Sequence, residues 1–227
     1  MGLVWRSRTS LVGQLIGLVR LVASFAAQLF YRPSDAVAEE YHKWYYGNLV
    51  WTKTTYMGIN CWKSVSDMWN YQDILSELQP SLVIEFGQPF KVLTVDNSHK
   101  ALDPRARREP DVLFVESSST DPAIAEQIQR LKNEYPGKIF AILDSDHSMN
   151  HVLAEMKLLR PLLSAGDYLV VEDSNINGHP VLPGFGPGPY EAIEAYEDEF
   201  PNDYKHDAER ENKFGWTSAP NGFLIRN

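Results

Sequence analysis

Several features that would assign the chain quickly are absent from its 227 residues. It has one cysteine, Cys61, so no intramolecular disulfide can form and stability must come from a hydrophobic core. Its net charge of −9 argues against nucleic acid as a partner, because phosphate binding needs clustered basic residues. No GxSxG, GxxxxGK[ST] or HExxH motif occurs, which removes the common hydrolase, P-loop and zinc-protease interpretations.

An uninterrupted apolar run long enough to cross a membrane is also missing. The N-terminal stretch "SLVGQLIGLVRLVASFAAQLF" is divided by Arg20 into pieces of about ten residues, whereas a helical span needs roughly twenty. We favour a basic, apolar helix within residues 1–34 that lies on a membrane surface or packs in a homo-oligomer. A cleaved signal peptide and an uncleaved span remain alternatives. The expected location is the cytoplasm, with peripheral contact at the inner face of the plasma membrane.

The chain is instead rich in apolar and aromatic residues, at 44% and 12% of its length, which predicts a packed core. Nine Trp or Tyr residues lie between Tyr41 and Tyr71, inside a segment, 35–80, that we expect to form a helical cap. Aromatic residues at this density either pack a cap onto a core or line a pocket, and we favour core packing. Apolar spacing predicts a helix over the last part of the segment, up to residue 78.

Strand and helix patterns alternate in the remaining part, residues 81–227, which predicts an α/β domain with a parallel sheet. The expected strands are 82–86, 91–95, 112–116, 139–143 and 168–171, with a further strand at the C-terminus. The expected helices are 122–134 and 149–163, and another helix follows the Gly/Pro-rich loop before residue 191. Ligands of such sheets bind beyond the carboxyl ends of the strands.

Acidic residues gather at those carboxyl ends. Four of them follow two of the predicted strands, in "LDSDHS" and "VEDS", namely Asp144, Asp146, Glu172 and Asp173. Clustered carboxylates repel one another unless a cation neutralises them, and their hard oxygen atoms select Mg²⁺, Ca²⁺ or Mn²⁺. His147 adjoins the cluster and is a candidate general base. The alternative is that Asp146 and His147 only cap the start of a helix.

Six motifs in order resemble one enzyme family: "VIEFG", "LTVDNSH", "VESSSTD", "ILDSDHS", "EMKLLRPLLSAGDYLVVEDS" and "GPGPYEAIEAY". Together they look like the cephalosporin hydroxylase and rhamnosyl O-methyltransferase family of S-adenosylmethionine-dependent enzymes. The resemblance covers roughly residues 40–227. It implies a Rossmann-like class I methyltransferase sheet, mostly parallel with an antiparallel last strand.

The resemblance also implies roles for individual residues. Glu85 and Gly87 would face the methionine part of S-adenosylmethionine, Asp96 would accept hydrogen bonds from the ribose, and Ser118 and Ser119 would lie near the adenine. Mg²⁺ would be held by Asp144 or Asp146 together with Glu172 and Asp173, with Asp144 also bordering the cofactor. His147, beside Asp146, would remove the proton of the acceptor hydroxyl.

The stretch "VIEFGQPFKVLTVD" departs from the family pattern. Two parallel neighbouring strands need a crossover of a dozen or more residues, usually a helix, but only "GQP" separates the predicted strands. About fifteen to twenty residues of the family pattern, a loop and a helix, are lacking after Gly87. We favour a protein that carries this segment although the sequence lacks it; in a true deletion, cofactor binding would be weakened. An intact mass of 25.8 kDa would refute the first explanation.

The leading functional hypothesis is Mg²⁺-assisted methyl transfer from S-adenosylmethionine to a sugar hydroxyl, on the rhamnosyl residue of a phenolic glycolipid. A glycosyltransferase is the alternative enzyme class, since "DSD" after a strand also fits a DxD site for a metal and a nucleotide sugar. A non-catalytic membrane-associated binding module is the third possibility.

Overall fold

The computed structural model describes residues 15–16, 18–23, 26, 35–56, 58–84, 91–101 and 103–227. The chain divides into two compact units, Met1–Val37 and Ala38–Asn227. The described residues between 15 and 26 are helical, and the rest of the predicted N-terminal segment lies outside the described residues. Among the residues that are described, no helix has both the length and the apolar character that a membrane crossing requires.

The aromatic-rich segment forms α2 (Asp35–Gly47), the 3-10 helix η1 (Val50–Lys53), the short hairpin β1 (Thr55–Tyr56) and β2 (Ile59–Asn60), and α3 (Val65–Leu78). Helix α3 begins at Ser64, whose side chain accepts a hydrogen bond from the backbone N–H of Asp67, as expected of a serine N-cap. It ends where Gln79 adopts a left-handed conformation with φ of 46°. Tyr71 and Ile74 are on the buried face of α3 and pack against the main sheet.

The main sheet has seven strands in the order β5-β4-β3-β6-β7-β9-β8. Strands β3 to β7 pair in parallel, whereas β9 is antiparallel to both of its neighbours. This confirms the predicted sheet, mostly parallel with an antiparallel last strand. The strands are β3 (Leu82–Ile84), β4 (Lys91–Asp96), β5 (Val112–Glu116), β6 (Ile139–Leu143), β7 (Tyr168–Val171), β8 (Tyr204–His206) and β9 (Phe223–Arg226).

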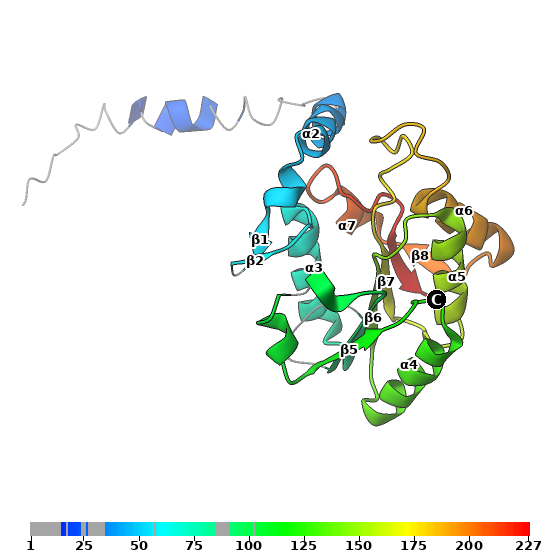
Figure 1. Cartoon of the computed structure of the whole chain (residues 1–227). Helices are drawn as coiled ribbons and strands as arrows, with labels where there is room; N and C mark the ends of the chain where they lie inside the picture. The colour runs from blue at the N-terminus through cyan, green and yellow to red at the C-terminus, as the bar shows by residue number, and fades with distance from the viewer. Residues whose placement is uncertain are drawn as a thin grey trace, which may run out of the picture. The chain divides into compact units, whose positions relative to one another are not determined.

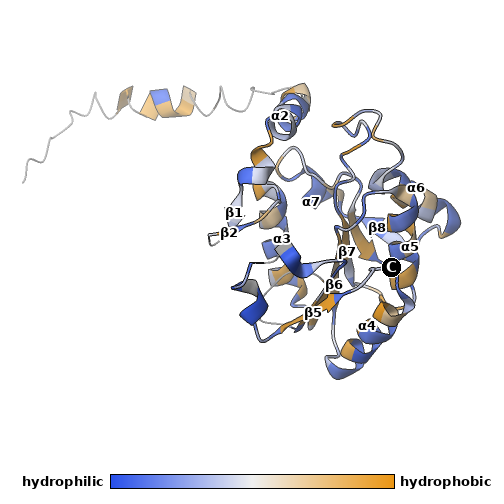
Figure 2. Cartoon of the chain, in the orientation of Figure 1, coloured by the Kyte–Doolittle hydropathy of each residue, from blue (hydrophilic) through white to orange (hydrophobic). Residues whose placement is uncertain are grey.

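Helices cover both faces of this sheet, with α3 on one side and α4, α5 and α6 on the other (Figure 1). Alternate residues of each strand point to opposite faces, so β3 contributes Leu82 and Ile84 to one buried cluster and Val83 to the other. The central strands are accordingly hydrophobic in Figure 2, and each fully buried Leu, Ile or Phe side chain contributes about 1.5–3 kcal/mol. The remaining helices are α4 (Pro122–Glu134), α5 (Met149–Leu159), α6 (Pro189–Glu199) and α7 (Ala208–Asn212), with 3-10 helices η2 (His99–Ala101) and η3 (Ala106–Arg108).

The structure corrects one predicted element, leaves the end of another outside the described residues and adds elements that were not predicted. The predicted helix 149–163 is too long, because α5 ends at Leu159 and Pro161, which has no N–H, cannot continue its hydrogen-bond ladder. The predicted strand 82–86 is described only as far as Ile84, since residues 85–90 lie outside the described residues. The hairpin β1–β2, strand β8 and helix α7 were not predicted.

Strands β3 and β4 are parallel neighbours although only six residues connect them. Leu82 is paired with Lys91 and Ile84 with Leu93. In this register Ile84 and Lys91 are separated by about two residues along the strand and one strand spacing, a distance of roughly 8 Å. Six residues can span about 20 Å, so the pairing is possible without a crossover helix.

Candidate active site

The site lies at the carboxyl ends of β6 and β7, the two neighbouring strands that carry the predicted acids. Leu143, the last residue of β6, is paired with Val171, the last residue of β7. The backbone N–H of Glu172 donates to the carbonyl of Leu143 at 2.9 Å, which keeps the two chains together beyond the paired region. Asp144 and Glu172 therefore leave the sheet side by side.

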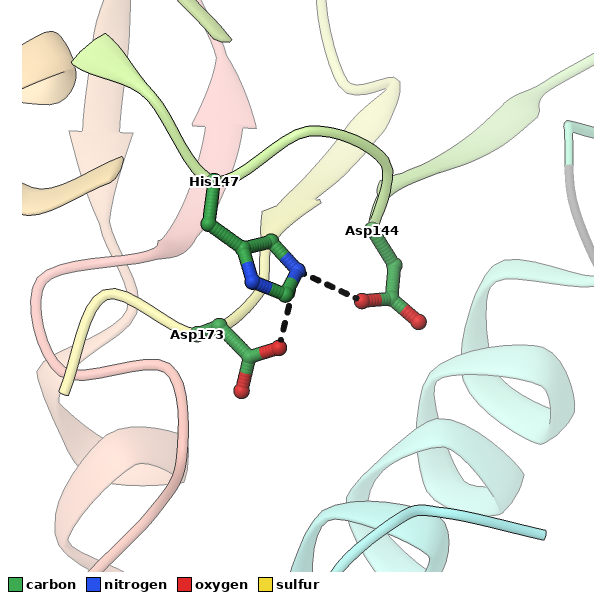
Figure 3. A group of neighbouring side chains, drawn as sticks. All are labelled: Asp144, His147 and Asp173. Carbon is green, nitrogen blue, oxygen red and sulfur yellow. Dashed lines mark ion pairs between the residues drawn. The ribbon is translucent and has the colours of Figure 1, made fainter. Parts of the chain in front are cut away.

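His147 lies between two of the carboxylates (Figure 3). Its Nε2 atom is 3.1 Å from Oδ2 of Asp173 and 3.5 Å from Oδ1 of Asp144. Ligand atoms of these three residues all lie within 4.8 Å of one another. The two carboxylates at this spacing fit a divalent cation such as Mg²⁺ or Mn²⁺, with the imidazole of His147 beside them.

Glu172 completes the cluster from a more deeply buried position. One of its carboxylate oxygens, Oε1, accepts a hydrogen bond from the hydroxyl of Tyr71 at 2.6 Å. The other, Oε2, forms an ion pair with Nζ of Lys63, which also pairs with Oδ2 of Asp144. Only 7% of the Glu172 side chain and 12% of the Lys63 side chain are exposed, so both charges are largely removed from water.

The pKa shifts in the cluster follow from burial and from these pairs. Burial raises the pKa values of Glu172 and Asp173, because it disfavours the charged carboxylates. Burial acts in the same direction on Asp144, but the charge of Lys63 and the hydrogen bond from His147 outweigh it and lower its pKa. For Lys63, burial would lower the pKa, but the charges of Glu172 and Asp144 raise it well above its usual value.

The backbone at Asp173 is left-handed, with φ of 52°, which is an unusual conformation for a residue other than glycine. The next two residues are fully buried and fixed by hydrogen bonds. Ser174 donates to the carbonyl of Pro220 at 2.6 Å, and the amide of Asn175 donates to Nε2 of His42 at 2.9 Å. Strained backbone held in this way is frequent at functional sites, where it positions a side chain.

Asp146 does not join the other acids. It is exposed, and its Oδ1 accepts the backbone N–H of Ser148 at 2.8 Å at the start of α5. The geometry therefore favours Asp144 over Asp146 as a metal ligand and matches the helix-capping alternative for Asp146. His147, in contrast, faces the cluster.

The predicted cofactor residues occupy the neighbouring strand ends, as far as they are described. Asp96 and Glu116 are paired at the carboxyl ends of β4 and β5. Ser118 bonds Thr120 at 2.9 Å, and Ser119 bonds Nε2 of His151 at 3.0 Å. Glu85 and Gly87 lie outside the described residues.

A cavity of about 280 Å³ opens beside the acidic cluster and joins it to the aromatic segment. Asp144, His147, Glu172 and Asp173 form one side of it. Aromatic residues form much of the rest, among them Tyr45, Tyr46, Trp51, Trp62 and Trp216. The aromatic segment therefore lines a pocket as well as packing against the sheet.

Two residues of the site were not anticipated from the sequence. Lys63 is one of three lysines spaced ten residues apart in the aromatic segment, and nothing in the sequence separates it from Lys43 and Lys53. Tyr71 was expected only as an aromatic residue of α3. Their roles depend on tertiary contacts with β6 and β7, more than 80 positions away, for which a single sequence carries no signal.

Comparison with known proteins identifies the family. The profile of the Rhamnosyl O-methyltransferase/CmcI family matches residues 48–90 and 87–227. The chain belongs to this family. The Rhamnosyl O-methyltransferase of Mycobacterium tuberculosis (strain ATCC 25618 / H37Rv) is 92% identical over 245 residues, covering 100% of both chains. That of Mycobacterium leprae (strain TN) is 71% identical over 226 residues, covering 92% of this chain and 98% of the relative.

Solved structures with the same fold include two of the protein CmcI. The one described as "CmcI-N160 apo-structure" has a TM-score of 0.58 at 18% identity and covers 77% of this chain and 76% of its own. The one described as "cmcI-D160 Mg-SAM" has a TM-score of 0.56 at 18% identity, covering 78% and 77%. At this identity the likeness supports the fold that the Rhamnosyl O-methyltransferase/CmcI family shares.

Proposed function

We propose that this protein transfers a methyl group from S-adenosylmethionine to a sugar hydroxyl with the help of Mg²⁺, and that the acceptor is the rhamnosyl residue of a phenolic glycolipid. The observation that carries the proposal is the cluster of Asp144, His147, Glu172 and Asp173 at one end of an aromatic cavity. The name of the 92% identical relative, Rhamnosyl O-methyltransferase, supports the sugar acceptor.

The described residues can do the work that this reaction requires. Asp144 and Asp173, with Glu172 behind them, offer oxygen ligands to Mg²⁺, which would polarise the acceptor hydroxyl and lower its pKa. His147 presents Nε2 to the same space and can take up the hydroxyl proton. Asp144 and Asp173 orient its ring. Aromatic residues of the cavity, such as Tyr46 and Trp51, whose stacked ring centroids lie 5.9 Å apart, offer flat surfaces to a sugar ring.

We further propose that Asp96 binds the ribose of the cofactor and that Ser118 and Ser119 lie near its adenine. Their place at the carboxyl ends of β4 and β5, where dinucleotide folds also bind their ligands, supports this assignment. Glu85 and Gly87 keep their predicted role beside the methionine part.

A missing segment after Gly87 is part of the proposal. The alignment with the Mycobacterium tuberculosis relative spans 245 positions against 227 residues here, which leaves 18 positions without a counterpart. The two matches of the family profile meet at residues 87–90, which supports placing the gap there. If the protein carries the segment, its intact mass will exceed 25.8 kDa by about 2 kDa, whereas a mass of 25.8 kDa would establish the deletion.

A methyl-transfer assay with labelled S-adenosylmethionine and a rhamnoside acceptor tests the function. It should use the 227-residue chain and a 245-residue form that carries the segment of the Mycobacterium tuberculosis relative. We expect Glu172→Gln and Asp173→Asn to lower the rate by at least about 10–100-fold, because each removes an oxygen charge that would hold the metal. Undiminished activity in both variants would refute the metal site, and no transfer by either form would refute the methyltransferase.

The glycosyltransferase alternative receives less support. The two acids of "DSD" do not converge on one site, because Asp144 faces the acidic cluster whereas Asp146 is exposed and accepts the backbone N–H of Ser148. Calorimetric titration with S-adenosylhomocysteine and with a nucleoside diphosphate separates the two. Binding of the nucleoside diphosphate alone would favour the glycosyltransferase over the methyltransferase.

We also propose that the N-terminal segment brings the enzyme to a membrane surface or to a second copy of itself. Its basic residues and apolar stretches suit a lipid-linked acceptor. Fractionation of the full chain and of a version that starts at Asp35 tests this. Equal membrane association and equal oligomeric state in both versions would contradict it.

A further inference from the structure

The ammonium group of Lys63 lies beside the proposed metal site and shares Asp144 with it. Its Nζ atom pairs with Oδ2 of Asp144 and with Oε2 of Glu172, so it already uses one oxygen atom of each of two proposed ligands. With 12% of the side chain exposed, Lys63 is a buried cation held between two carboxylates.

A divalent cation and this ammonium group cannot both occupy the space between these oxygens. Mg²⁺ approaches carboxylate oxygens to 2.0–2.1 Å and tolerates little distortion of its octahedral shell. A positive charge held a few ångströms away repels it strongly where water is largely excluded. Without a metal, however, removal of the ammonium would leave buried, unpaired carboxylates, which is strongly unfavourable.

The backbone at Lys63 is anchored, which leaves the side chain as the part that can move. Its carbonyl accepts a hydrogen bond from Thr54 Oγ1 at 3.2 Å, and the next residue, Ser64, caps α3 through Asp67. The lysine side chain has four rotatable bonds, and the aromatic cavity lies next to it. The ammonium can therefore swing into the cavity while the loop stays in place.

We propose that Lys63 is a resident counter-cation of the metal site, which neutralises Asp144 and Glu172 in the metal-free protein and is displaced into the aromatic cavity when a divalent cation binds. This inference rests on the proposed function. It links metal loading to the acceptor side of the site, since the displaced ammonium becomes part of the cavity that would receive the sugar. The tethered ammonium competes at a high effective concentration with any cation that enters the site. A monovalent cation carries no more charge than the ammonium that it would displace, so the site favours divalent cations.

The first test is Mn²⁺ binding to the full chain, measured from the electron paramagnetic resonance signal of the free ion. Lys63→Met removes the competing charge and should bind Mn²⁺ at least about tenfold more tightly than the wild type. Lys53→Met is the matched control, since Lys53 is exposed in the same segment, and its affinity should equal that of the wild type. Equal or weaker binding by Lys63→Met would overturn the inference and leave the metal site standing. Absence of Mn²⁺ binding by both the wild type and Lys63→Met would overturn the site itself.

The second test uses the wild-type chain and does not depend on the folding of a variant. Acetylation of lysines by N-hydroxysuccinimide acetate, followed by peptide mass spectrometry, reports whether each ammonium is accessible. Lys63 should be protected without metal and should react severalfold faster at saturating Mg²⁺, whereas Lys53 should react equally in both conditions. Protection of Lys63 that stays unchanged on addition of Mg²⁺ would show that the ammonium is not displaced.

Discussion

The hydroxyl of Tyr71 helps to position Glu172 in the acidic cluster. This hydroxyl, buried on α3, donates to Oε1 of Glu172 at 2.6 Å, on the side of the carboxylate away from the ion pair with Lys63. The bond fixes the orientation of Glu172. A hydrogen bond to a buried charged group contributes about 1.5–3 kcal/mol to stability.

Tyr71→Phe should therefore lower the free energy of unfolding by about 1.5–3 kcal/mol, because it leaves Oε1 of Glu172 buried without this donor. Urea denaturation followed by tryptophan fluorescence measures the change. Tyr46→Phe is the control, since Tyr46 lines the same cavity and its hydroxyl bonds no side chain among the described residues. A loss of equal size in both variants would show that the Tyr71 hydroxyl contributes nothing specific.

His42 makes the stability depend on pH. It is 3% exposed, and burial lowers its pKa from the ordinary value of 6.5 to about 4. The hydrogen bond from the amide of Asn175 to its Nε2 fits a neutral ring. The unfolded chain takes up a proton near pH 6.5 and the folded chain only near pH 4, so the unfolded state binds more protons between these values. Stability is thus full above about pH 6.5 and declines as the pH falls towards 4.

The decline attributable to His42 should reach about 3 kcal/mol at pH 4, as 2.5 pH units at 1.36 kcal/mol each. Unfolding free energies of the wild type and His42→Gln, measured in urea at several pH values, isolate this part from the titration of carboxylates. The wild-type curve should fall more steeply between pH 6.5 and 4. Parallel curves would exclude His42 as the cause.

At the scale of the elements, the close approach of β9 to the end of β7 depends on Gly222. A Cβ atom at this position would lie 2.2 Å from the carbonyl oxygen of Val171 and 3.1 Å from that of Ala219. The backbone N–H of Val171 also donates to the carbonyl of Gly222 at 2.9 Å. Val171 directly precedes Glu172, so this contact also sets where the acidic cluster begins.

Gly222→Ala should destabilise the fold by about 1–3 kcal/mol and weaken Mn²⁺ binding, because the strand end that carries Glu172 and Asp173 must move. Thermal unfolding and Mn²⁺ titration measure the two effects. Gly47→Ala is the matched control, since a Cβ atom there meets no atom within 4 Å, and it should change stability by less than about 1 kcal/mol. Unchanged metal affinity in Gly222→Ala would show that the contact between Gly222 and Val171 does not position the metal site.

The strongly patterned elements could be predicted from the sequence. Strands β5, β6 and β7 and helix α4 have the predicted bounds, because each combines a clear apolar pattern with a marked end such as Asp121 before Pro122. The short strand β8 and the helix α7 were missed, since three to five residues carry no distinct period and these elements depend on contacts with β9.

The acids of the candidate site were partly predictable for the same reason. Parallel strands place their carboxyl ends together, so the convergence of Asp144, Glu172 and Asp173 followed from the strand predictions. The choice between Asp144 and Asp146 required the conformation of one loop, where Asp146 turns to bond the backbone N–H of Ser148. Lys63 and Tyr71 reach the site only through tertiary packing, which composition and periodicity do not encode.

At the scale of the whole molecule, the metal site and the proposed cofactor site depend on different parts of the sheet. The metal site is built on β6 and β7, whereas the gap in the family pattern lies between β3 and β4. Pairing of β3 with β4 and with β6 persists without the missing segment. The order of the strands therefore does not require it.

Restoring the segment should raise the affinity for S-adenosylhomocysteine and leave the affinity for Mn²⁺ unchanged. A 245-residue form that carries the segment of the Mycobacterium tuberculosis relative should bind S-adenosylhomocysteine at least about tenfold more tightly than the 227-residue chain, an increase of about 1.4 kcal/mol in binding free energy. Its Mn²⁺ affinity should be the same. Calorimetry of both forms with both ligands measures this, and equal affinity for S-adenosylhomocysteine would show that the segment does not contribute to the cofactor site.

In the 227-residue chain, the six-residue connection between β3 and β4 also has a consequence for folding kinetics. Leu82 and Lys91 are nine positions apart, and loops of about ten residues close in 10–100 ns. The parallel pair β3–β4 thus becomes a contact local in sequence, of the kind that speeds folding. Pulsed hydrogen exchange during refolding should find the amides of Val92 and Leu93 protected before those of β7, and the reverse order would contradict this. In a form that carries the 18 additional residues, this pairing must wait for a longer loop to close, whereas in the 227-residue chain the β3–β4 pair is where the sheet begins to fold.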